Sequence, residues 1–295
     1  MNGFGAILTA MITPFDSRGE LDANESARLA AWLVNRGTDG LVIAGTTGEG
    51  TTLDARERHD LLTAVKGAIS GNARLIANIG TNDVRSTIAN AKDAQACGAD
   101  ALLVVVPPYA KPTQGGMLEF FGAVAEATPL PIVVYNIPGR TAANMLPATL
   151  LELNRRHANI VGVKESSGDL KQIATIVRDR PAGFIVWSGD DHLFLPALAV
   201  GADGVVGVAS HLCSREYQEL LAAYRGGDPA RAAAIHNALL ELMDALFAVT
   251  NPIAVKWAMN ELGFDAGRCR PPLDTLPPVI AQRLQPIVAS YLTTA

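Results

Sequence analysis

Short apolar runs recur along the first 225 residues, and each is followed by a loop and a stretch with helical periodicity. Eight of these runs are rich in Val, Ile and Leu and lack polar alternation, which is typical of strands buried on both faces of a parallel sheet. They span Ala6–Ile12, Gly40–Ala44, Arg74–Ile79, Ala101–Val106, Pro131–Tyr135, Ile160–Val163, Phe184–Trp187 and Gly204–Val208. The pattern therefore predicts a chain in which strands and helices alternate.

Helix boundaries between the runs follow from capping residues. Asp54, with Glu57 three positions later, has the pattern of a capping box. The pair Asn82-Asp83 is expected to open the next helix, which runs to Cys97, and Asp169 is expected to open a later one. These starts each fall a short loop after a predicted strand.

The number of strand–helix units predicts the fold class. Eight units in about 225 residues match the size of an α/β fold of the (β/α)8 TIM-barrel type. A doubly wound sheet is less suitable, because the segment after the first strand, Thr13–Asp16, is not rich in glycine. The strand signal then disappears, and helices are predicted at 229–249, 252–262 and 277–292. We expect a barrel over residues 1–225 and a C-terminal helical region over residues 226–295.

The composition excludes several classes of protein. The chain has 295 residues, of which 49% are hydrophobic, and a net charge of −5. Its densest apolar stretch, Ala101–Val106, is far shorter than the roughly 20 residues of a membrane-spanning helix. No Lys/Arg run indicates nucleic-acid binding, no signal-peptide pattern is present, and three widely spaced cysteines indicate no disulfide framework. We expect a cytoplasmic protein with no membrane or nucleic-acid partner.

Polar and reactive residues follow several of the predicted strands. The active site of a TIM barrel lies at the C-terminal ends of its strands, so the loops there are the first place to search for chemistry. The loops with such residues are Gly45–Gly50, Pro107–Tyr109, Tyr135–Arg140 and Lys164–Gly168. The sequence therefore predicts one rim of the barrel as the reactive end.

Lys164 and Tyr135 are the strongest candidates for catalysis. Lys164 follows the apolar run Ile160–Val163, so its side chain starts inside the barrel mouth. Burial disfavours the charged form of an amine, and a neutral amine can attack a carbonyl to form a Schiff base. Tyr135 ends the neighbouring strand, where a phenol can transfer protons to such an adduct. The alternatives are a lysine that reaches solvent or pairs with Glu165, and a tyrosine that only fills the rim.

Two further features could bind a carboxylate. The Gly45–Gly50 loop offers the hydroxyls of Thr46 and Thr47 together with backbone N–H groups. Arg140, after a Pro-Gly pair, could bind a carboxylate with two hydrogen bonds. Taken singly, the loop could be a structural turn and the arginine a surface residue.

Other kinds of site lack the residues that they need. The five histidines have no metal-ligand spacing. Asp190, Asp191 and His192 form the nearest approach to a ligand cluster, and we interpret them as a loop and helix cap. No phosphate-binding glycine motif follows a strand. We therefore expect no metal and no organic cofactor.

Six motifs together resemble the dihydrodipicolinate synthase family, within the superfamily of Schiff-base-forming pyruvate aldolases. They occur in the family's order and cover nearly the whole chain. The motifs are GTTGEG (Gly45–Gly50), PPY (Pro107–Tyr109), YNIPGRT (Tyr135–Thr141), VGVKESSG (Val161–Gly168), SGDD (Ser188–Asp191) and NPIAVKWA (Asn251–Ala258). The resemblance implies condensation of pyruvate with L-aspartate 4-semialdehyde to 4-hydroxy-tetrahydrodipicolinate, in lysine and diaminopimelate biosynthesis.

The resemblance also implies roles for single residues. Lys164 would form the Schiff base with pyruvate, and Tyr135 would donate and accept protons there. Thr46 would link Tyr135 to Tyr109, which would reach in from a neighbouring subunit. A homotetramer built from tight dimers is therefore implied.

Substrate carboxylates are assigned by the same resemblance. Thr47 would hold the carboxylate of pyruvate, helped by the backbone at Val206. Arg140 would bind the carboxylate of aspartate semialdehyde. The family needs no metal and no organic cofactor for this chemistry.

Some positions depart from the family's usual pattern. Pro108 replaces a tyrosine that often contributes to a regulatory lysine site, and Arg58 and Ser86 stand where that site often has histidine and glutamate, although Asn82 is kept. We therefore predict weak or absent feedback inhibition by lysine. His211 stands where asparagine is expected, and nothing is inferred from it.

Two other functions stay open on the sequence alone. One is another Schiff-base lyase of the superfamily, an aldolase or dehydratase acting on 2-keto-3-deoxy sugar acids, which would share Lys164 and Tyr135. The other is a non-catalytic binding or regulatory protein on the same barrel. Retention of Lys164, Tyr135, Thr46 and Tyr109 together argues against the second.

Overall fold

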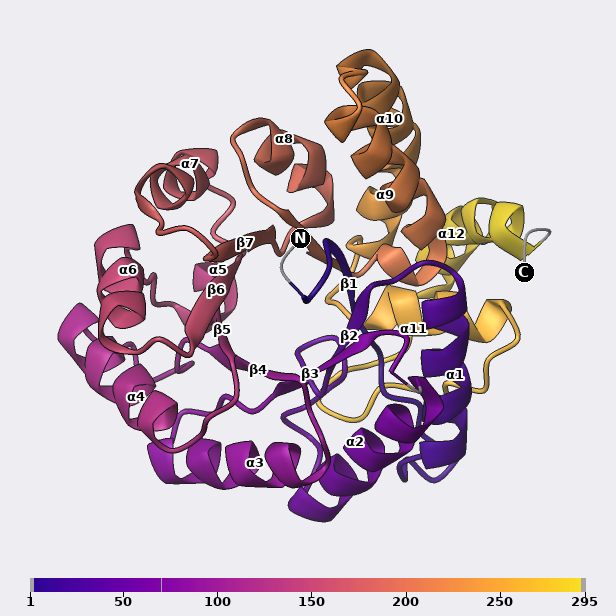
Figure 1. Ribbon diagram of the computed structural model, residues 1–295. Coiled ribbons are helices and arrows are strands. Elements are labelled where there is room, and N and C mark those ends of the chain that lie inside the picture. Colours follow the sequence, from indigo (N-terminus) through magenta and orange to yellow (C-terminus); the bar gives the residue numbers. More distant parts are fainter. Residues whose placement is uncertain (1–2, 70, 293–295) are drawn as a thin grey trace. The chain divides into compact units, whose positions relative to one another are not determined.

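Eight parallel strands close into a barrel in sequence order, from β1 to β8, as the alternating pattern predicts. The computed structural model describes residues 3–69 and 71–292 (Figure 1). The strands are β1 Ile7–Ala10, β2 Gly40–Ile43, β3 Arg74–Asn78, β4 Ala101–Val105, β5 Ile132–Asn136, β6 Ile160–Glu165, β7 Ile185–Ser188 and β8 Gly204–Gly207. The predicted TIM barrel is confirmed.

Helices separate successive strands and then continue to the end of the described chain. The predicted C-terminal helices are confirmed as α10, α11 and α12. The helices are α1 Ala23–Asn35, α2 Ala55–Ile69, α3 Val84–Ala96, α4 Gln114–Glu126, α5 Pro138–Thr141, α6 Pro147–Arg156, α7 Leu170–Asp179, the 3-10 helix η1 Asp191–Leu193, α8 Phe194–Ala199, α9 Ser210–Arg225, α10 Pro229–Leu246, α11 Ile253–Glu261 and α12 Pro278–Leu292.

The predicted helix caps form as expected. The Glu57 backbone N–H donates to the Asp54 carboxylate at 2.8 Å, and the Asp54 N–H donates to the Glu57 carboxylate at 3.1 Å, which completes a capping box. Asp83 and Asp169 likewise accept backbone N–H groups in the first turns of α3 and α7. Local sequence therefore sets where these helices begin.

Two strands extend beyond the predicted apolar runs. β5 includes Asn136 and β6 includes Lys164 and Glu165, so neither Tyr135 nor Lys164 is the last residue of its strand. The prediction was wrong there because it ended each strand where the apolar residues end. Asn136 and Glu165 are polar yet only 1% exposed.

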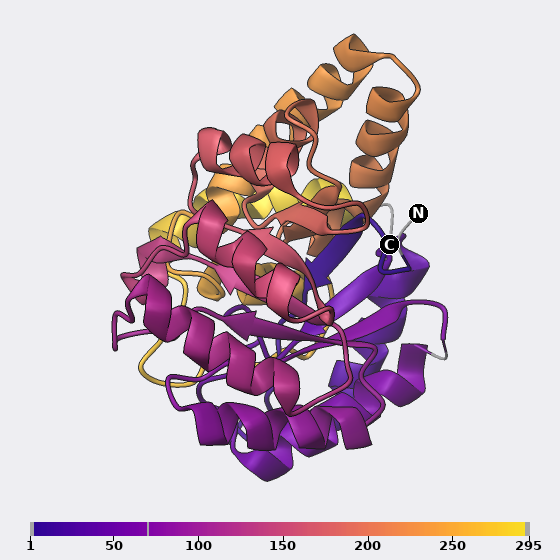
Figure 2. The ribbon, with the colours of Figure 1, turned by 60° about the vertical axis from the view of Figure 1, so that its left-hand side comes forward.

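The chain divides into two compact units. One consists of Met1–Ala6 and Arg74–Val206, and the other of Ile7–Ala73 and Gly207–Ala295. In the first, β3 to β7 lie side by side with α3, α4, α6 and α7 outside them (Figure 1). In the second, α9 and α10 pack against each other (Figure 2). Across the described residues, no helix is long and apolar enough to cross a membrane.

His211 is a buried imidazole of the second unit. Its Nε2 accepts the backbone N–H of Ile12 at 3.1 Å, and its Nδ1 lies 2.8 Å from the carbonyl oxygen of Val208. These two bonds require the neutral ring with its proton on Nδ1. Burial lowers the pKa of His211 to about 4, whereas an unfolded histidine titrates near 6.5.

This pKa difference predicts a pH-dependent contribution to stability. Between pH 6.5 and about 4 the unfolded state binds a proton at His211 that the folded state does not, so the free energy of unfolding falls as the pH falls. The loss is about 1.4 kcal/mol per pH unit across this window, and about 3 kcal/mol in all. Urea denaturation of the wild type and of His211→Asn at several pH values measures it. Parallel pH curves for the two proteins would contradict the assignment.

Candidate active site

The first unit places Lys164 beside Tyr135. The parallel register of β5 and β6 pairs these two residues directly, so their side chains leave the same face of adjacent strands. Lys164 is 6% exposed and Tyr135 is 5% exposed. The Lys164 Nζ lies 4.3 Å from the centroid of the Tyr135 ring. A buried amine and a phenol are therefore within reach of one small molecule.

Neither structural alternative for Lys164 is realised. The side chain is buried, so it does not extend into solvent. Glu165 accepts hydrogen bonds from the side chains of Asn136 and Gln172 and from the Ser167 N–H, on the other side of β6. Within the described residues Lys164 takes part in no ion pair. The amine is thus not consumed by a structural partner.

The loop after β7 borders the lysine. A Cβ atom added at Gly189 would lie 1.8 Å from the Ser166 Oγ and 2.9 Å from the Lys164 Cε, so a larger residue there would displace these two side chains. Burial raises the pKa of Asp190, and the positive charge of Lys164 opposes this shift. Sequence reasoning missed Gly189, Asp190 and Ser166 as neighbours of the lysine. The adjacency of β7 and β6 in a barrel was the signal that could have found them.

Two other candidate residues of the first unit lie at the surface. Tyr109 is 90% exposed and has a positive φ of 69°, so the loop after β4 turns its side chain outward. Arg140 lies on the four-residue helix α5 and is exposed. Val206 is an interior residue of β8 and is 1% exposed. The structure thus places Tyr109 and Arg140 at the surface, whereas Lys164 and Tyr135 are buried.

The Gly45–Gly50 loop belongs to the second unit and has a tightly determined backbone. A Cβ at Gly50 would lie 1.9 Å from the carbonyl oxygen of Ala44, and Glu49 adopts a left-handed φ of 50°. The Thr13 hydroxyl donates to the Gly48 carbonyl at 2.6 Å. The backbone positions of Thr46 and Thr47 are therefore well defined.

Thr47 is held from the C-terminal region. Its side chain is 4% exposed, and its Oγ1 accepts a hydrogen bond from the Asn251 Nδ2 at 2.9 Å. Because the Thr47 Oγ1 accepts from Asn251, its hydroxyl proton points away from that amide and is available to an acceptor elsewhere. That arrangement suits a hydroxyl that must donate to a carboxylate.

A buried ion pair supports the same loop. The Lys256 Nζ lies 2.7 Å from the Glu49 carboxylate, and both side chains are 1% exposed. The Arg270 N–H donates to the other Glu49 oxygen at 2.7 Å, and the Lys256 Nζ lies 4.0 Å from the centroid of the Phe15 ring. Burial and the Glu49 charge raise the pKa of the Cys269 thiol to about 12. Lys256 lies within the NPIAVKWA motif, but nothing in the sequence alone indicates that it pairs with Glu49.

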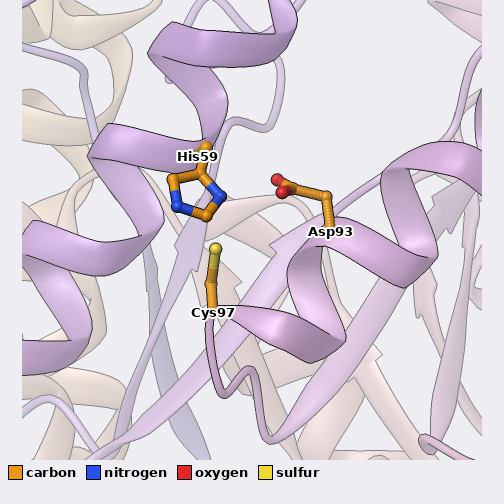
Figure 3. Close-up of side chains that lie close together, drawn as sticks. All are labelled: His59, Asp93 and Cys97. Atoms are coloured by element: carbon orange, nitrogen blue, oxygen red, sulfur yellow. The ribbon is translucent and has the colours of Figure 1, made fainter.

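Two possible metal ligands lie at the other end of the first unit. Asp93 and Cys97 stand one turn apart at the C-terminal end of α3, and His59 is a residue of α2 (Figure 3). α3 runs back along the barrel to the start of β4, so this turn is remote from the strand ends that carry Lys164 and Tyr135.

A family model matches nearly the whole chain. The model describes the dihydrodipicolinate synthetase family and covers residues 3–290. Among curated proteins, the chain is 48% identical over 270 residues to a 4-hydroxy-tetrahydrodipicolinate synthase of Moorella thermoacetica, with 92% of each chain covered. The similarity therefore includes both compact units.

Solved structures share the fold at high similarity. A dihydrodipicolinate synthase from Cyanidioschyzon merolae with lysine bound superposes with a TM-score of 0.97 at 41% identity, covering 99% of this chain and 100% of that one. A dihydrodipicolinate synthase from Bacillus anthracis gives a TM-score of 0.95 at 39% identity, covering 98% and 99%. The architecture and the sequence motifs thus agree with the same set of proteins.

The buried Lys256–Glu49 pair predicts a large loss of stability when one partner is removed. Lys256→Met leaves the Glu49 carboxylate buried without its cation, and we expect the free energy of unfolding to fall by about 3–5 kcal/mol. Guanidinium denaturation monitored by circular dichroism measures the change.

An exposed pair provides the matched control. Arg155 lies on α6 and pairs with Glu152 at the surface, where water screens the charges, so Arg155→Met should lower the free energy of unfolding far less than Lys256→Met does. Equal losses in the free energy of unfolding for the two variants would show that the buried Lys256–Glu49 pair stabilises the fold no more than an exposed ion pair does.

Proposed function

The chain belongs to the dihydrodipicolinate synthetase family, and from that premise we propose that it condenses pyruvate with L-aspartate 4-semialdehyde to give 4-hydroxy-tetrahydrodipicolinate. The resemblance drawn from the motifs is confirmed, and the chain is an enzyme of the Schiff-base lyase class. One observation carries the mechanism: the buried Lys164 amine lies 4.3 Å from the centroid of the Tyr135 ring.

Lys164 performs the covalent steps. Its amine attacks C2 of pyruvate to give a carbinolamine, which loses water to give an imine. Loss of a proton from C3 gives an enamine, and C3 then attacks the aldehyde carbon of the semialdehyde. The amino group of the joined product attacks C2, closes the ring and releases Lys164 as the free amine.

Tyr135 supplies and removes protons during these steps. Formation of the imine requires a proton for the departing water, and formation of the enamine requires a base at C3. A phenol held against the lysine by the strand register is suited to both. Water is restricted, because the two side chains are nearly fully buried.

Thr46 and Tyr109 complete the proton path. We assign to Thr46 the link between Tyr135 and Tyr109, and to Tyr109 a position in the site of a neighbouring subunit. Its 90% exposure supports this assignment, because a side chain directed into solvent is available to a partner. The proposed assembly is a homotetramer of tight dimers, located in the cytoplasm.

The carboxylates of the two substrates are bound by different groups. Thr47, oriented by Asn251, and the backbone at Val206 hold the carboxylate of pyruvate. Arg140 binds that of the semialdehyde, and its exposed position on α5 suits a substrate that arrives second. None of the proposed steps needs a metal or an organic cofactor.

Weak feedback by lysine stays a prediction. The Arg58 guanidinium is buried and donates to the Gly50 carbonyl at 2.8 Å, and the Ser86 hydroxyl donates to the Asp83 carboxylate at 2.7 Å. Both side chains are thus engaged by residues of their own unit. This supports the expectation that they do not replace the usual lysine-binding groups.

Borohydride trapping tests the Schiff base. Incubation with pyruvate and sodium borohydride should give a reduced adduct on Lys164, found by peptide mass spectrometry. Lys164→Ala should give none, while Lys171→Ala, at an exposed lysine of α7, should behave as the wild type. Absence of an adduct in the wild type would exclude every Schiff-base mechanism. A coupled assay with the semialdehyde, compared with a panel of 2-keto-3-deoxy sugar acids, identifies the second substrate.

Arg140→Ala separates the two substrates. Loss of a charge-assisted hydrogen bond should lower kcat/KM for the semialdehyde by roughly 10- to 100-fold. The yield of the pyruvate adduct on Lys164 should not change. Steady-state kinetics with Arg178→Ala as control, an exposed arginine paired with Asp179, measure the effect. An equal loss in pyruvate trapping would contradict the assigned role.

A further inference from the structure

A buried polar network lies directly behind the Lys164–Tyr135 pair. The register that pairs Tyr135 with Lys164 also pairs Asn136 with Glu165. Because successive side chains of a strand point to opposite faces, Asn136 and Glu165 lie on the helix-facing side of the sheet. Both are 1% exposed.

The Glu165 carboxylate is satisfied entirely by neutral donors among the described residues. It accepts the Asn136 Nδ2 at 3.1 Å on each oxygen, the Gln172 Nε2 at 3.1 Å and the Ser167 N–H at 2.8 Å. Gln172 comes from α7, so strands and helix meet at this carboxylate. Burial raises the pKa of Glu165, and these hydrogen bonds oppose the shift.

The network continues into the segment after α5. The Asn144 Oδ1 accepts the Asn136 Nδ2 at 2.7 Å and the Gln172 Nε2 at 3.1 Å, while the Asn144 Nδ2 donates to the Gln172 Oε1 at 3.0 Å. The Met145 N–H donates to the Asn136 Oδ1 at 2.9 Å. This segment follows directly on the helix that carries Arg140.

Such a network fixes geometry at an energetic cost. A buried carboxylate with no cation partner loses hydration that neutral donors replace only in part. Each donor and acceptor has a defined direction, so the end of β5, the end of β6, α7 and the segment after α5 can pack together in only one arrangement. Apolar side chains of similar size would hold these elements together without fixing that arrangement.

We propose that Glu165, Asn136 and Gln172 are positioning residues that hold Lys164 and Tyr135 in their reactive arrangement, and that Asn144 couples this network to α5, which carries Arg140. The proposal rests on the proposed function, since it assigns what the network does for that reaction. Glu165 and Asn136 are bonded through the backbone to the two reactive residues, so a shift of either moves the amine or the phenol. Misplacement of a reactive group by about 1 Å can cost about 100-fold in rate.

Glu165→Gln tests the first half of the proposal. The amide nitrogen of glutamine cannot accept, so one donor of the network faces another donor. We expect kcat to fall by up to about 100-fold, and the initial rate of borohydride trapping with pyruvate to fall with it. KM for pyruvate should change little, because Thr47 still binds its carboxylate. Far-UV circular dichroism establishes that the variant is folded.

A compensating substitution separates positioning from folding. In the double variant Glu165→Gln with Gln172→Glu, the amide at 165 can donate to the new carboxylate at 172. Recovery of most of kcat per folded molecule supports the proposal. Recovery of thermal stability alone, with kcat unchanged from the single variant, contradicts it.

Asn144→Ala tests the second half and does not depend on the folding of the first variant. Asn144 is only half-buried, so its removal leaves a smaller defect. We expect the KM for the semialdehyde to rise, because Arg140 shifts with α5. Pyruvate trapping on Lys164 should proceed at the wild-type rate. An unchanged KM for the semialdehyde overturns the coupling to Arg140.

Asn154→Ala is the matched control. Asn154 is also half-buried, and its Nδ2 donates to the Ile160 carbonyl at 2.7 Å, at the opposite end of β6. It should reduce stability without changing kcat or either KM. If Glu165→Gln matches the wild type, or Asn154→Ala reproduces its kinetic defect, the network is structural only. Failure of the wild type to form an adduct with pyruvate would instead overturn the proposed function.

Discussion

The parallel register of β5 with β6 is the constraint on which the rest of the site depends. It sets Tyr135 opposite Lys164 and, one step on, Asn136 opposite Glu165. Because side chains alternate along a strand, the first pair faces the barrel interior and the second pair faces the helices. A slip of one residue would exchange the two faces and bury the carboxylate where the amine must be. One backbone alignment therefore determines both the reactive pair and the polar network behind it.

The sequence predicts the barrel and its reactive end because both depend on local patterns. Apolar runs mark the eight strands, and Asp54, Asp83 and Asp169 cap their helices as the spacing indicates. Lys164 and Tyr135 could be found because each follows such a run. What could not be predicted is which buried polar groups pair with each other. Glu49 and Lys256 are separated by 207 positions, and no periodicity in the chain connects them.

The C-terminal helical region contributes to the second unit beyond covering it. Asn251 orients Thr47, and Lys256 neutralises Glu49 two residues further along the same loop. The loop's own glycines permit its tight backbone, but they do not select one arrangement of the threonine hydroxyls. Selection comes from directional bonds made by residues far along the chain. The helices after the barrel are thus part of the arrangement that would bind a carboxylate.

Two lysines are buried among the residues that the structure describes, and their surroundings differ. Lys256 lies 2.7 Å from the Glu49 carboxylate, so its ammonium is bound to a structural anion. Lys164 is followed in sequence by a buried carboxylate of its own, yet Glu165 is satisfied by Asn136, Gln172 and the Ser167 N–H on the other face of the strand. The alternation of side chains along β6 therefore separates this carboxylate from the amine, and neutral donors satisfy it on its own face. Burial alone therefore does not distinguish the lysine proposed as the nucleophile from the structural lysine, and the difference lies in whether an ion pair holds the ammonium.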